Sequence, residues 1–309
     1  MIKFSKPEMV KDYVPLGKHH GRRESAWIWS IAFSNDDKFL ASCADDHLVK
    51  VWNVEDRKLE FEMNEHSASV QFVLFSPDDK ILASASRDGT IRLTDVTKRK
   101  VVAVLQGHTS HVNSLSFTPD GKRLVSVGHD GKLIIWDLST NQPTYEYQDE
   151  IEATQLWAVI CEPNGEGIYF GGTNRKLQYL SLESNPVVTM ELDLNFDLTS
   201  LAFSPDGATL SATASNGVIY LLDHASQNLT DTFTGHSADA MSTSFSPNMT
   251  TLVSGCHDGN LRFWNLATKE RTIAFEAHDN HIHCVRFSNS GKILASGGWD
   301  GSIRLWLRN

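Results

Sequence analysis

The sequence predicts an all-β fold made of seven similar units in a closed ring, and three observations lead to this prediction. A string with an Asp-Gly turn, alternating apolar residues and often a tryptophan recurs along the chain, as in SRDGTIRLTD, GHDGKLIIWD, CHDGNLRFWN and GWDGSIRLWL. The copies lie about 42 residues apart, and no segment of useful length has a helical period. Repeats of roughly 40–45 residues with four short strands each are typical of β-propeller blades.

The repeats end near seven equivalent positions, spaced by 42 residues except for one interval of 44. These positions are Trp52, Thr94, Trp136, Leu180, Leu222, Trp264 and Trp306. Seven such units occupy almost the whole chain of 309 residues, which leaves no room for a second domain. We therefore expect residues 1–309 to form a single seven-bladed β-propeller.

Each repeat is expected to supply four antiparallel strands, and the third repeat shows the pattern clearly. Its alternating apolar residues, β-branched side chains and turn residues favour hairpins. The predicted strands of this repeat are residues 112–117, 123–127, 133–136 and about 144–147.

The two ends of the chain are predicted to share one blade. Only three residues follow Trp306, so the last repeat lacks its fourth strand, whereas residues 13–19 align with residues 102–108 of the second repeat. We expect the N-terminal strand to complete the C-terminal blade, which protects sheet edges that an open ring would expose. Pro15 fits this arrangement if the strand is an outer edge.

Composition and charge argue against several classes of function, although a local basic patch remains open. The formal net charge is −10, whereas a general binder of nucleic acid or acidic membranes needs a basic face. No apolar run approaches the about 20 residues of a membrane span, and the charged N-terminus does not resemble a secretory signal. Cys43, Cys161, Cys256 and Cys284 lack CxxC spacing, so we expect reduced thiols and an intracellular protein, in the cytoplasm, the nucleus or both.

Serine, histidine and aspartate recur together at a constant spacing in four repeats. The histidine precedes the aspartate by 22 residues, the serine by four, and a tryptophan or Thr94 follows six residues after the aspartate. The sets are His66, Ser84 and Asp88; His108, Ser126, Asp130 and Trp136; His236, Ser254, Asp258 and Trp264; and His278, Ser296, Asp300 and Trp306. An active site normally occurs once, so we interpret the repeated set as structural.

Other chemical motifs are absent from the sequence, since there is no GxSxG, GxxxxGK[ST] or HExxH pattern. We expect no catalytic residues, no metal site and no cofactor, and we keep an enzyme only as a distant alternative. In repeats four and five, Glu152 and Leu194 stand where histidine is expected, and Asn174 and Asn216 replace the aspartate. Those blades are expected to rely on apolar packing.

These repeats resemble the WD40 repeat family over nearly the whole chain, through the GH…WD signature quoted above. The resemblance implies that the repeated serine, histidine, aspartate and tryptophan form a hydrogen-bonded network within each blade. It also implies a role as a subunit of larger assemblies. The first repeat, at residues 29–32 and 45–52, further resembles the small WD40 subunits of RNA-surveillance and transcription-associated complexes.

Three positions in each repeat are predicted to project at one mouth of the central channel: three and five residues after the histidine, and the residue before the turn aspartate. The four tryptophans outside the repeat-end positions all fall in this set. Aromatic, methionine and arginine side chains are the usual anchors of protein interfaces. The candidate partner-binding residues are Trp27, Trp29, Arg87, His111, His129, Trp157, Met241, His257, His281, His283 and Trp299.

Alternatives remain open for this face. Some of the tryptophans could pack between blades while a partner binds at the side or on the opposite face. The histidines suggest a pH-sensitive or metal contact, although no cysteine or paired carboxylate accompanies them. Residues 18–25, with Arg22 and Arg23, are predicted to form a long loop on the same face.

We expect a non-catalytic protein–protein interaction scaffold that binds a peptide or protein partner on this loop face within a larger complex. It is expected to be monomeric when isolated and to bind neither nucleic acid nor membranes directly. Alternatives are a small WD40 subunit of an RNA-surveillance or transcription-associated complex, a histone-tail reader with an aromatic site for a cation, and a ubiquitin-ligase substrate receptor. The last is disfavoured because no arginine stands three residues after the repeat-end positions.

Overall fold

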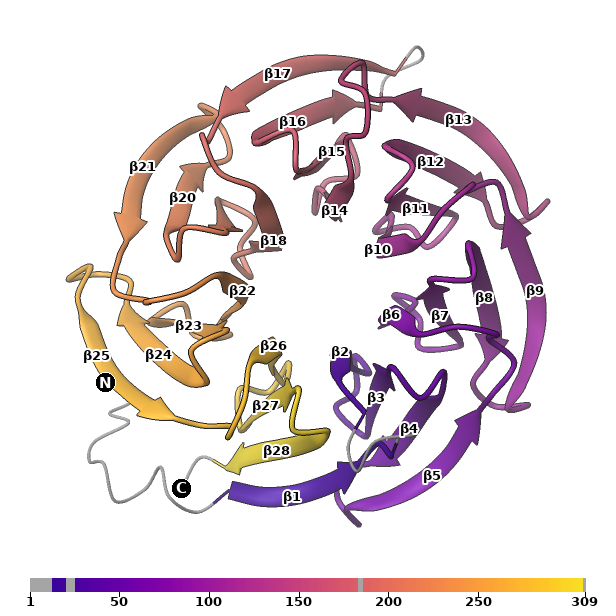
Figure 1. Ribbon diagram of the computed structural model, residues 1–309, viewed down its shortest axis with the longest axis horizontal. Helices are drawn as coiled ribbons and strands as arrows, with labels where there is room; N and C mark the ends of the chain where they lie inside the picture. Colours follow the sequence, from indigo (N-terminus) through magenta and orange to yellow (C-terminus); the bar gives the residue numbers. More distant parts are fainter. Residues whose placement is uncertain (1–12, 21–25, 183–185, 308–309) are drawn as a thin grey trace.

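Seven four-stranded antiparallel sheets surround a central axis in the computed structural model, which describes residues 13–20, 26–182 and 186–307 (Figure 1). The innermost strands are β2 (Ile28–Phe33), β6 (Val70–Phe75), β10 (Val112–Phe117), β14 (Leu156–Cys161), β18 (Leu198–Phe203), β22 (Ala240–Phe245) and β26 (Ile282–Phe287). The second strands are β3 (Phe39–Ala44), β7 (Ile81–Ser86), β11 (Arg123–Gly128), β15 (Gly167–Gly172), β19 (Thr209–Ala214), β23 (Thr251–Cys256) and β27 (Ile293–Gly298).

The outer two strands complete each blade. The third strands are β4 (Val49–Asn53), β8 (Thr90–Asp95), β12 (Lys132–Asp137), β16 (Lys176–Ser181), β20 (Ile219–Asp223), β24 (Asn260–Asn265) and β28 (Ser302–Leu307). The outermost strands are β1 (Tyr13–Lys18), β5 (Lys58–Met63), β9 (Lys100–Gln106), β13 (Gln142–Gln148), β17 (Val187–Asp193), β21 (Asn228–Phe233) and β25 (Arg271–Glu276). Blades 1 to 6 each contain four consecutive strands, starting from β2–β5, and blade 7 contains β26–β28 with β1.

The prediction that the N-terminal strand completes the last blade is confirmed. Strand β1 pairs antiparallel with β28, and the sheet order is β1-β28-β27-β26. Pro15 lies on this outer edge strand, the place in a sheet where proline is tolerated. The closure brings β2 of blade 1 against β26 of blade 7, so residues from opposite ends of the chain become neighbours.

The core lies between the blades, where each sheet packs on the next. In blade 3, for example, Trp136 joins a buried cluster with Leu124, Ile134 and Val112. In repeats four and five the equivalent positions, Leu180 and Leu222, are also buried. Because neighbouring blades cover both faces of a sheet, the second strands are buried along nearly their whole length, whereas the outermost strands alternate between exposed and less exposed residues.

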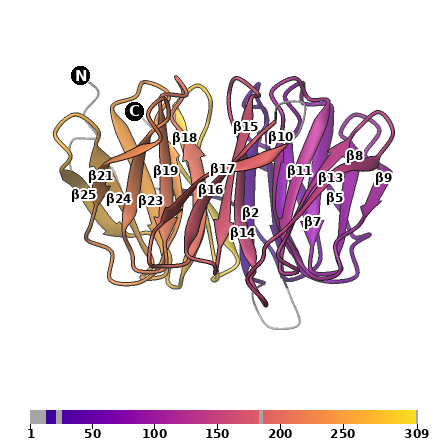
Figure 2. The same cartoon turned by 90° about the horizontal axis from the view of Figure 1, so that it is seen from above.

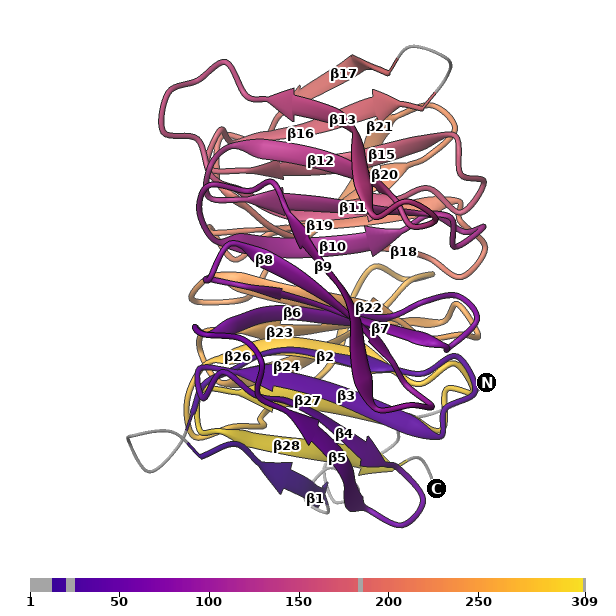
Figure 3. The ribbon, with the colours of Figure 1, turned by 90° about the vertical axis from the view of Figure 1, so that its right-hand side faces the viewer.

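The ring is a flat disc when seen edge-on, and the turns between strands gather on its two faces (Figures 2 and 3). The loops that enter the innermost strands share one face with the turns between second and third strands, because the strands alternate in direction. Across the residues with described positions, no helix is long and apolar enough to cross a membrane.

Candidate partner-binding mouth

Two kinds of loop are tied together on one face in every blade. The residue before the turn aspartate donates its backbone N–H to the carbonyl of a residue in the loop that enters the innermost strand. The pairs, donor first, are Asp45 and Trp27, Arg87 and Ser69, His129 and His111, Thr173 and Gln155, Ser215 and Asp197, His257 and Asp239, and Trp299 and His281. Two of the three predicted positions per repeat therefore lie side by side.

The remaining predicted position, the one expected five residues after the histidine, lies on a β-bulge at the start of each innermost strand. Pairing with the second strand shifts register across the second residue of the innermost strand in all seven blades. A bulge leaves its extra residue out of the ladder and re-aims the side chain. The bulged residues all line the central cavity, and they are Trp29, Gln71, Asn113, Trp157, Thr199, Met241 and His283.

This cavity has a volume of about 330 Å³ and lies where the innermost strands converge. Eight of the eleven candidate partner-binding residues line it, namely Trp29, Arg87, His129, Trp157, Met241, His257, His283 and Trp299. The other three make ring contacts with these, since Trp27 and His281 stack on Trp299 and His111 packs against His129. We call the cavity and its rim of eleven residues the mouth.

Aromatic rings cluster on the side of the mouth formed by blades 6, 7 and 1. Trp299 stacks on Trp27 with ring centroids 4.0 Å apart and planes at 7°, and it stacks on His281 at 4.3 Å. Trp29 lies edge-on to Trp27 at 6.1 Å and to His283 at 4.6 Å. Offset stacking and edge-to-face contacts are favourable geometries for such rings. The cluster depends on ring closure, since it joins residues 27–29 to residues 281–299.

Hydrogen bonds hold Trp29 in place on the cavity wall. Its indole Nε1 donates to Asp45 Oδ1 at 2.7 Å, and the Ser69 hydroxyl donates to the same oxygen at 2.6 Å. The Arg87 guanidinium lies 4.8 Å from the centre of the Trp29 ring, in cation–π geometry. Trp299 differs, because its Nε1 is buried with no hydrogen-bond partner in the described part of the chain.

Burial favours the neutral form of two mouth histidines, His129 and His283, by lowering the pKa of each. Burial, together with the positive charge of neighbouring His111 and Arg87, lowers the pKa of His129 to about 4. Burial and neighbouring His257 lower the pKa of His283 well below its usual range. At neutral pH these rings therefore contribute polar and aromatic surface rather than charge.

Comparison with known families agrees with this architecture. The family model described as the IFT122 first β-propeller matches residues 85–309, and the model described as WD domain, G-beta repeat matches residues 14–53 and 57–95. The chain belongs to the WD40-repeat β-propeller family. WD40 propellers generally serve as platforms for protein–protein interaction, so the family supports a scaffold role for this chain.

One curated relative is the general transcriptional corepressor TUP1 of Saccharomyces cerevisiae (strain ATCC 204508 / S288c). This WD40 chain is 33% identical to it over 66 residues, which are 21% of this chain and 9% of the yeast protein. The match covers a small part of both proteins.

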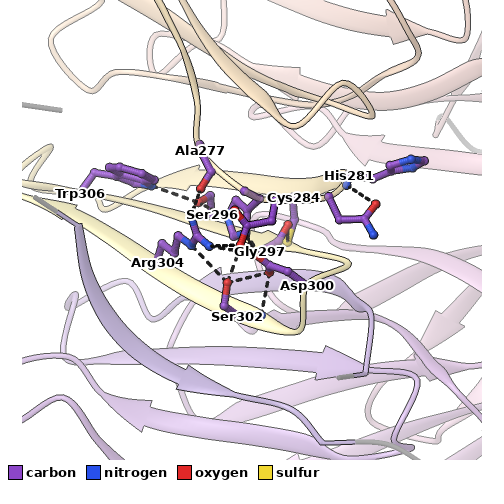
Figure 4. Close-up of polar contacts among 12 residues, drawn as sticks. Ala277, His281, Cys284, Ser296, Gly297, Asp300, Ser302, Arg304 and Trp306 are labelled. Atoms are coloured by element: carbon purple, nitrogen blue, oxygen red, sulfur yellow. Dashed lines mark hydrogen bonds and ion pairs between the residues drawn. The ribbon is translucent and has the colours of Figure 1, made fainter. Parts of the chain in front are cut away.

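The tryptophan, serine, histidine and aspartate of the WD40 hydrogen-bond network are all in contact in blades 3 and 7. Blade 2 has the same contacts except that of the tryptophan, which Thr94 replaces. In blade 3, Trp136 Nε1 donates to Ser126 Oγ at 2.9 Å, Ser126 donates to His108 Nε2 at 2.8 Å, and His108 Nδ1 donates to the Asp130 carboxylate at 3.0 Å. Figure 4 shows the matching contacts in blade 7, where Arg304 also pairs with Asp300. Both histidine nitrogens have partners, which fixes the tautomer.

Burial of the network aspartates is outweighed by the hydrogen bonds that they accept. Burial alone would raise the pKa of Asp88, but hydrogen bonds from Thr90 and His66 lower it to about 2. These carboxylates remain ionised throughout the neutral range and tie a loop to a strand in each blade. These contacts give the repeated serine, histidine and aspartate a structural role.

Blade 6 departs from this pattern. The Arg262 guanidinium lies against His236 Nδ1 and donates to Asp258 at 3.0 Å, so His236 Nδ1 is 3.8 Å from Asp258. Because His236 Nδ1 accepts from arginine, its Nε2 must donate to Ser254, which is the opposite tautomer from the other blades. His236, Cys256 and Asp258 are grouped closely enough for a metal ion, but Arg262 already supplies the positive charge there.

Blade 1 contains a network that the spacing argument missed. His19 Nδ1 donates to Asp46 at 2.8 Å, Ser42 donates to His19 Nε2 at 2.8 Å, and Trp52 Nε1 donates to Ser42 at 2.8 Å. The loop entering β2 is five residues longer than elsewhere, so histidine and aspartate are 27 residues apart. Ser42 stands four residues before Asp46 and Trp52 six residues after it, as in the other sets, so the sequence did contain a signal for this network.

Blade 4 corrects another expectation. Glu152 is exposed and does not occupy the histidine position, because the loop before β14 has two extra residues. Asp149 is buried instead, and it accepts a hydrogen bond from Asn174 Nδ2 at 2.7 Å. In blade 5, Leu194 is buried. Most of the predicted long loop, residues 21–25 with Arg22 and Arg23, lies outside the described residues.

Acidification is expected to weaken the fold through His236. Burial and the charge of Arg262 lower its pKa to about 4, so the folded state prefers the neutral ring. The unfolded chain takes up this proton near pH 6.5, so stability present above that pH is lost as the pH falls toward 4. The loss is of the order of 3 kcal/mol.

Urea denaturation of wild type and His236→Asn between pH 7.5 and pH 4.5 measures this effect. The variant should be less stable at pH 7.5 and lose less stability on acidification. Parallel pH profiles for the two proteins would show that His236 is not responsible.

Proposed function

We propose that this WD40 propeller is a non-catalytic scaffold that holds a protein or peptide partner at the mouth, as a subunit of a larger complex. The observation that carries the proposal is the cluster of partly exposed tryptophan and histidine rings beside an open central cavity. Monomeric soluble proteins rarely leave such rings uncovered without a binding role. Fixed aromatic side chains around a cavity match the anchors of protein interfaces.

The absence of catalysis is part of this proposal. The histidine, serine and aspartate sets that resemble catalytic triads recur in five blades. In each set the serine hydrogen-bonds to the histidine, and in blades 1, 3, 6 and 7 it also accepts from a tryptophan indole. All five serines are buried among these partners, so none is exposed to a substrate. We also propose an intracellular location, which the four buried cysteines without a disulfide support.

Among the alternatives, the histone-tail reader is disfavoured by the charge of the cavity. A reader of methylated lysine needs an aromatic cage without competing cations, whereas Arg87 and Arg286 line this cavity. A place in an RNA-surveillance or transcription-associated complex stays a proposal that rests on the resemblance of the first repeat. No contact in the described residues favours a ubiquitin-ligase receptor.

Site-specific photo-crosslinking tests the scaffold proposal. Ser215 and Ala225 flank the two ends of β20, Ser215 on the same face as the mouth and Ala225 on the other face. A photoreactive phenylalanine analogue at Ser215 of the tagged full chain should capture a partner from native extract, and the same analogue at Ala225 should not. Capture only at Ala225, or recovery of the chain solely as a free monomer at physiological salt, would contradict the proposal.

A further inference from the structure

The cavity of the mouth has a charge opposite to that of the whole chain. Arg87 and Arg286 line it, and no aspartate or glutamate is among its lining residues, although the chain carries a net charge of −10. The pKa of each lining histidine, His129, His257 and His283, is lowered chiefly by burial, so these rings favour the neutral form at physiological pH. Two guanidinium groups therefore dominate the potential inside a narrow, partly desolvated space, where electrostatic interactions are stronger than in water.

Arg286 breaks the pattern of the repeats. It lies on β26, at a position where the six other innermost strands carry small or apolar residues. Those residues are Ala32, Leu74, Ser116, Ile160, Ala202 and Ser244. Because the other six blades form without a charge at this position, the fold does not need Arg286 there. This points to a role specific to blade 7.

The Arg286 guanidinium has only neutral partners. Its Nη1 donates to Ser242 Oγ at 3.0 Å, to the Thr243 carbonyl at 3.2 Å and to the Val285 carbonyl at 2.9 Å. No carboxylate of the described chain lies within ion-pair distance of it, and burial lowers its pKa. Arg286 is half-buried, and even partial desolvation of an unpaired ion is costly.

Arg87 is likewise without an ion pair in the described residues, and it rests on the Trp29 ring at the entrance to the cavity. Carboxylates do occur around the rim, but each already has a partner within the chain. Asp45 accepts from Trp29 and Ser69, Asp239 lies 3.7 Å from His257, and Asp197 lies 3.6 Å from Arg175. Neither arginine of the cavity is neutralised from within the described structure.

We propose that the cavity binds a carboxylate carried by a partner peptide, either an aspartate or glutamate side chain or a C-terminal carboxylate. Arg87 at the entrance and Arg286 deeper along β26 both attract the carboxylate, because a guanidinium fork matches carboxylate geometry better than any other side chain. A neighbouring apolar side chain of the peptide packs on Trp157 and Met241, which belong to other blades and line the same cavity. This inference rests on the proposed function and specifies the chemistry of the partner.

Selection from a phage-displayed library of random twelve-residue peptides against the immobilised full chain tests the inference. Enriched sequences should share an aspartate or glutamate next to an apolar residue. The most enriched peptide, synthesised and titrated by calorimetry, should lose affinity at least about tenfold when that acidic residue becomes its amide. Versions with free and amidated C-termini distinguish a side-chain carboxylate from a terminal one.

Each variant of the protein introduces a residue that another blade already has at the equivalent position. Arg87→Ser introduces the residue of blade 5 at that position, and Arg286→Ser introduces that of blades 3 and 6. Each should weaken the acidic peptide at least about tenfold, and Arg286→Lys should restore part of the loss. Arg57→Gln, on the opposite face where blade 5 has Gln227, is the matched control and should bind like wild type. If Arg286→Ser fails to fold, Arg87→Ser still decides the outcome.

The result separates this inference from the proposed function. Neutral or basic peptides whose binding is lost in Trp299→Ala would overturn the carboxylate site and leave the scaffold proposal standing. Acidic peptides that bind Arg87→Ser as tightly as wild type would also overturn the inference. Enriched peptides that are all insensitive to Trp299→Ala would count against both.

Discussion

Replacing Trp299 by alanine is expected to weaken partner binding by about 30-fold or more while the propeller stays folded. Trp299 lies at the centre of the ring cluster, where it stacks on Trp27 and His281 and faces the cavity. Its removal deletes a large aromatic surface from this wall and takes away the ring on which Trp27 stacks. Truncated aromatic anchors in well-packed positions typically cost about 2 kcal/mol or more of binding free energy.

The measurement is a calorimetric titration of the partner recovered by crosslinking against wild type and variant, with thermal unfolding as the test of folding. Trp299→Phe should retain part of the affinity because a ring remains in the stack. Trp157→Ala removes an anchor from the far wall of the same cavity and should also weaken binding. Val102→Ala, on the exposed outer edge of β9, should change nothing. A folded Trp299→Ala protein with wild-type affinity would place the interface elsewhere.

Replacing Trp136 by alanine is expected to lower the free energy of unfolding by about 3–5 kcal/mol. Trp136 is 1% exposed and packs with Leu124 and Ile134 in the core of blade 3. Its indole also donates to Ser126 Oγ, so the substitution leaves a cavity and removes one donor from the hydrogen-bonded chain to His108. Both effects destabilise the folded state, and neither acts at the mouth.

Urea denaturation followed by circular dichroism measures this loss. Thr94→Ala is the matched comparison, because Thr94 occupies the same position in blade 2 and is buried, but it has a much smaller side chain. We expect a clearly smaller loss for Thr94→Ala than for Trp136→Ala. Equal midpoints for wild type and Trp136→Ala would show that the tryptophan contributes little to the blade.

Most of the fold could be predicted because the repeat carries its own strand and turn signals every 42 residues. The strands predicted for the third repeat agree with β10–β13 to within two residues at each end. Two irregular loops caused the errors. The longer loop before β2 hid the His19 network, and the extra residues before β14 placed Glu152 where Asp149 contributes. Counting from the histidine fails wherever a loop changes length.

The mouth was predictable only in part. Constant offsets from the histidine identified the positions that share one face, since every blade repeats the same bulge and the same loop contact. The offsets did not include Arg286, which lies deeper along β26, although its charge among six small or apolar equivalents was visible in the sequence. Its significance depends on which groups surround it.

The sequence by itself determined the all-β architecture, the number of blades, the closure by the N-terminal strand and the positions that face the mouth. These follow from local periodicity and turn chemistry, which repeat in every unit. Only the tertiary structure decided that Trp299 stacks on Trp27 and that Arg87 and Arg286 share a cavity without a carboxylate. Stacking and charge balance depend on side chains from strands hundreds of residues apart, which meet only because the ring closes.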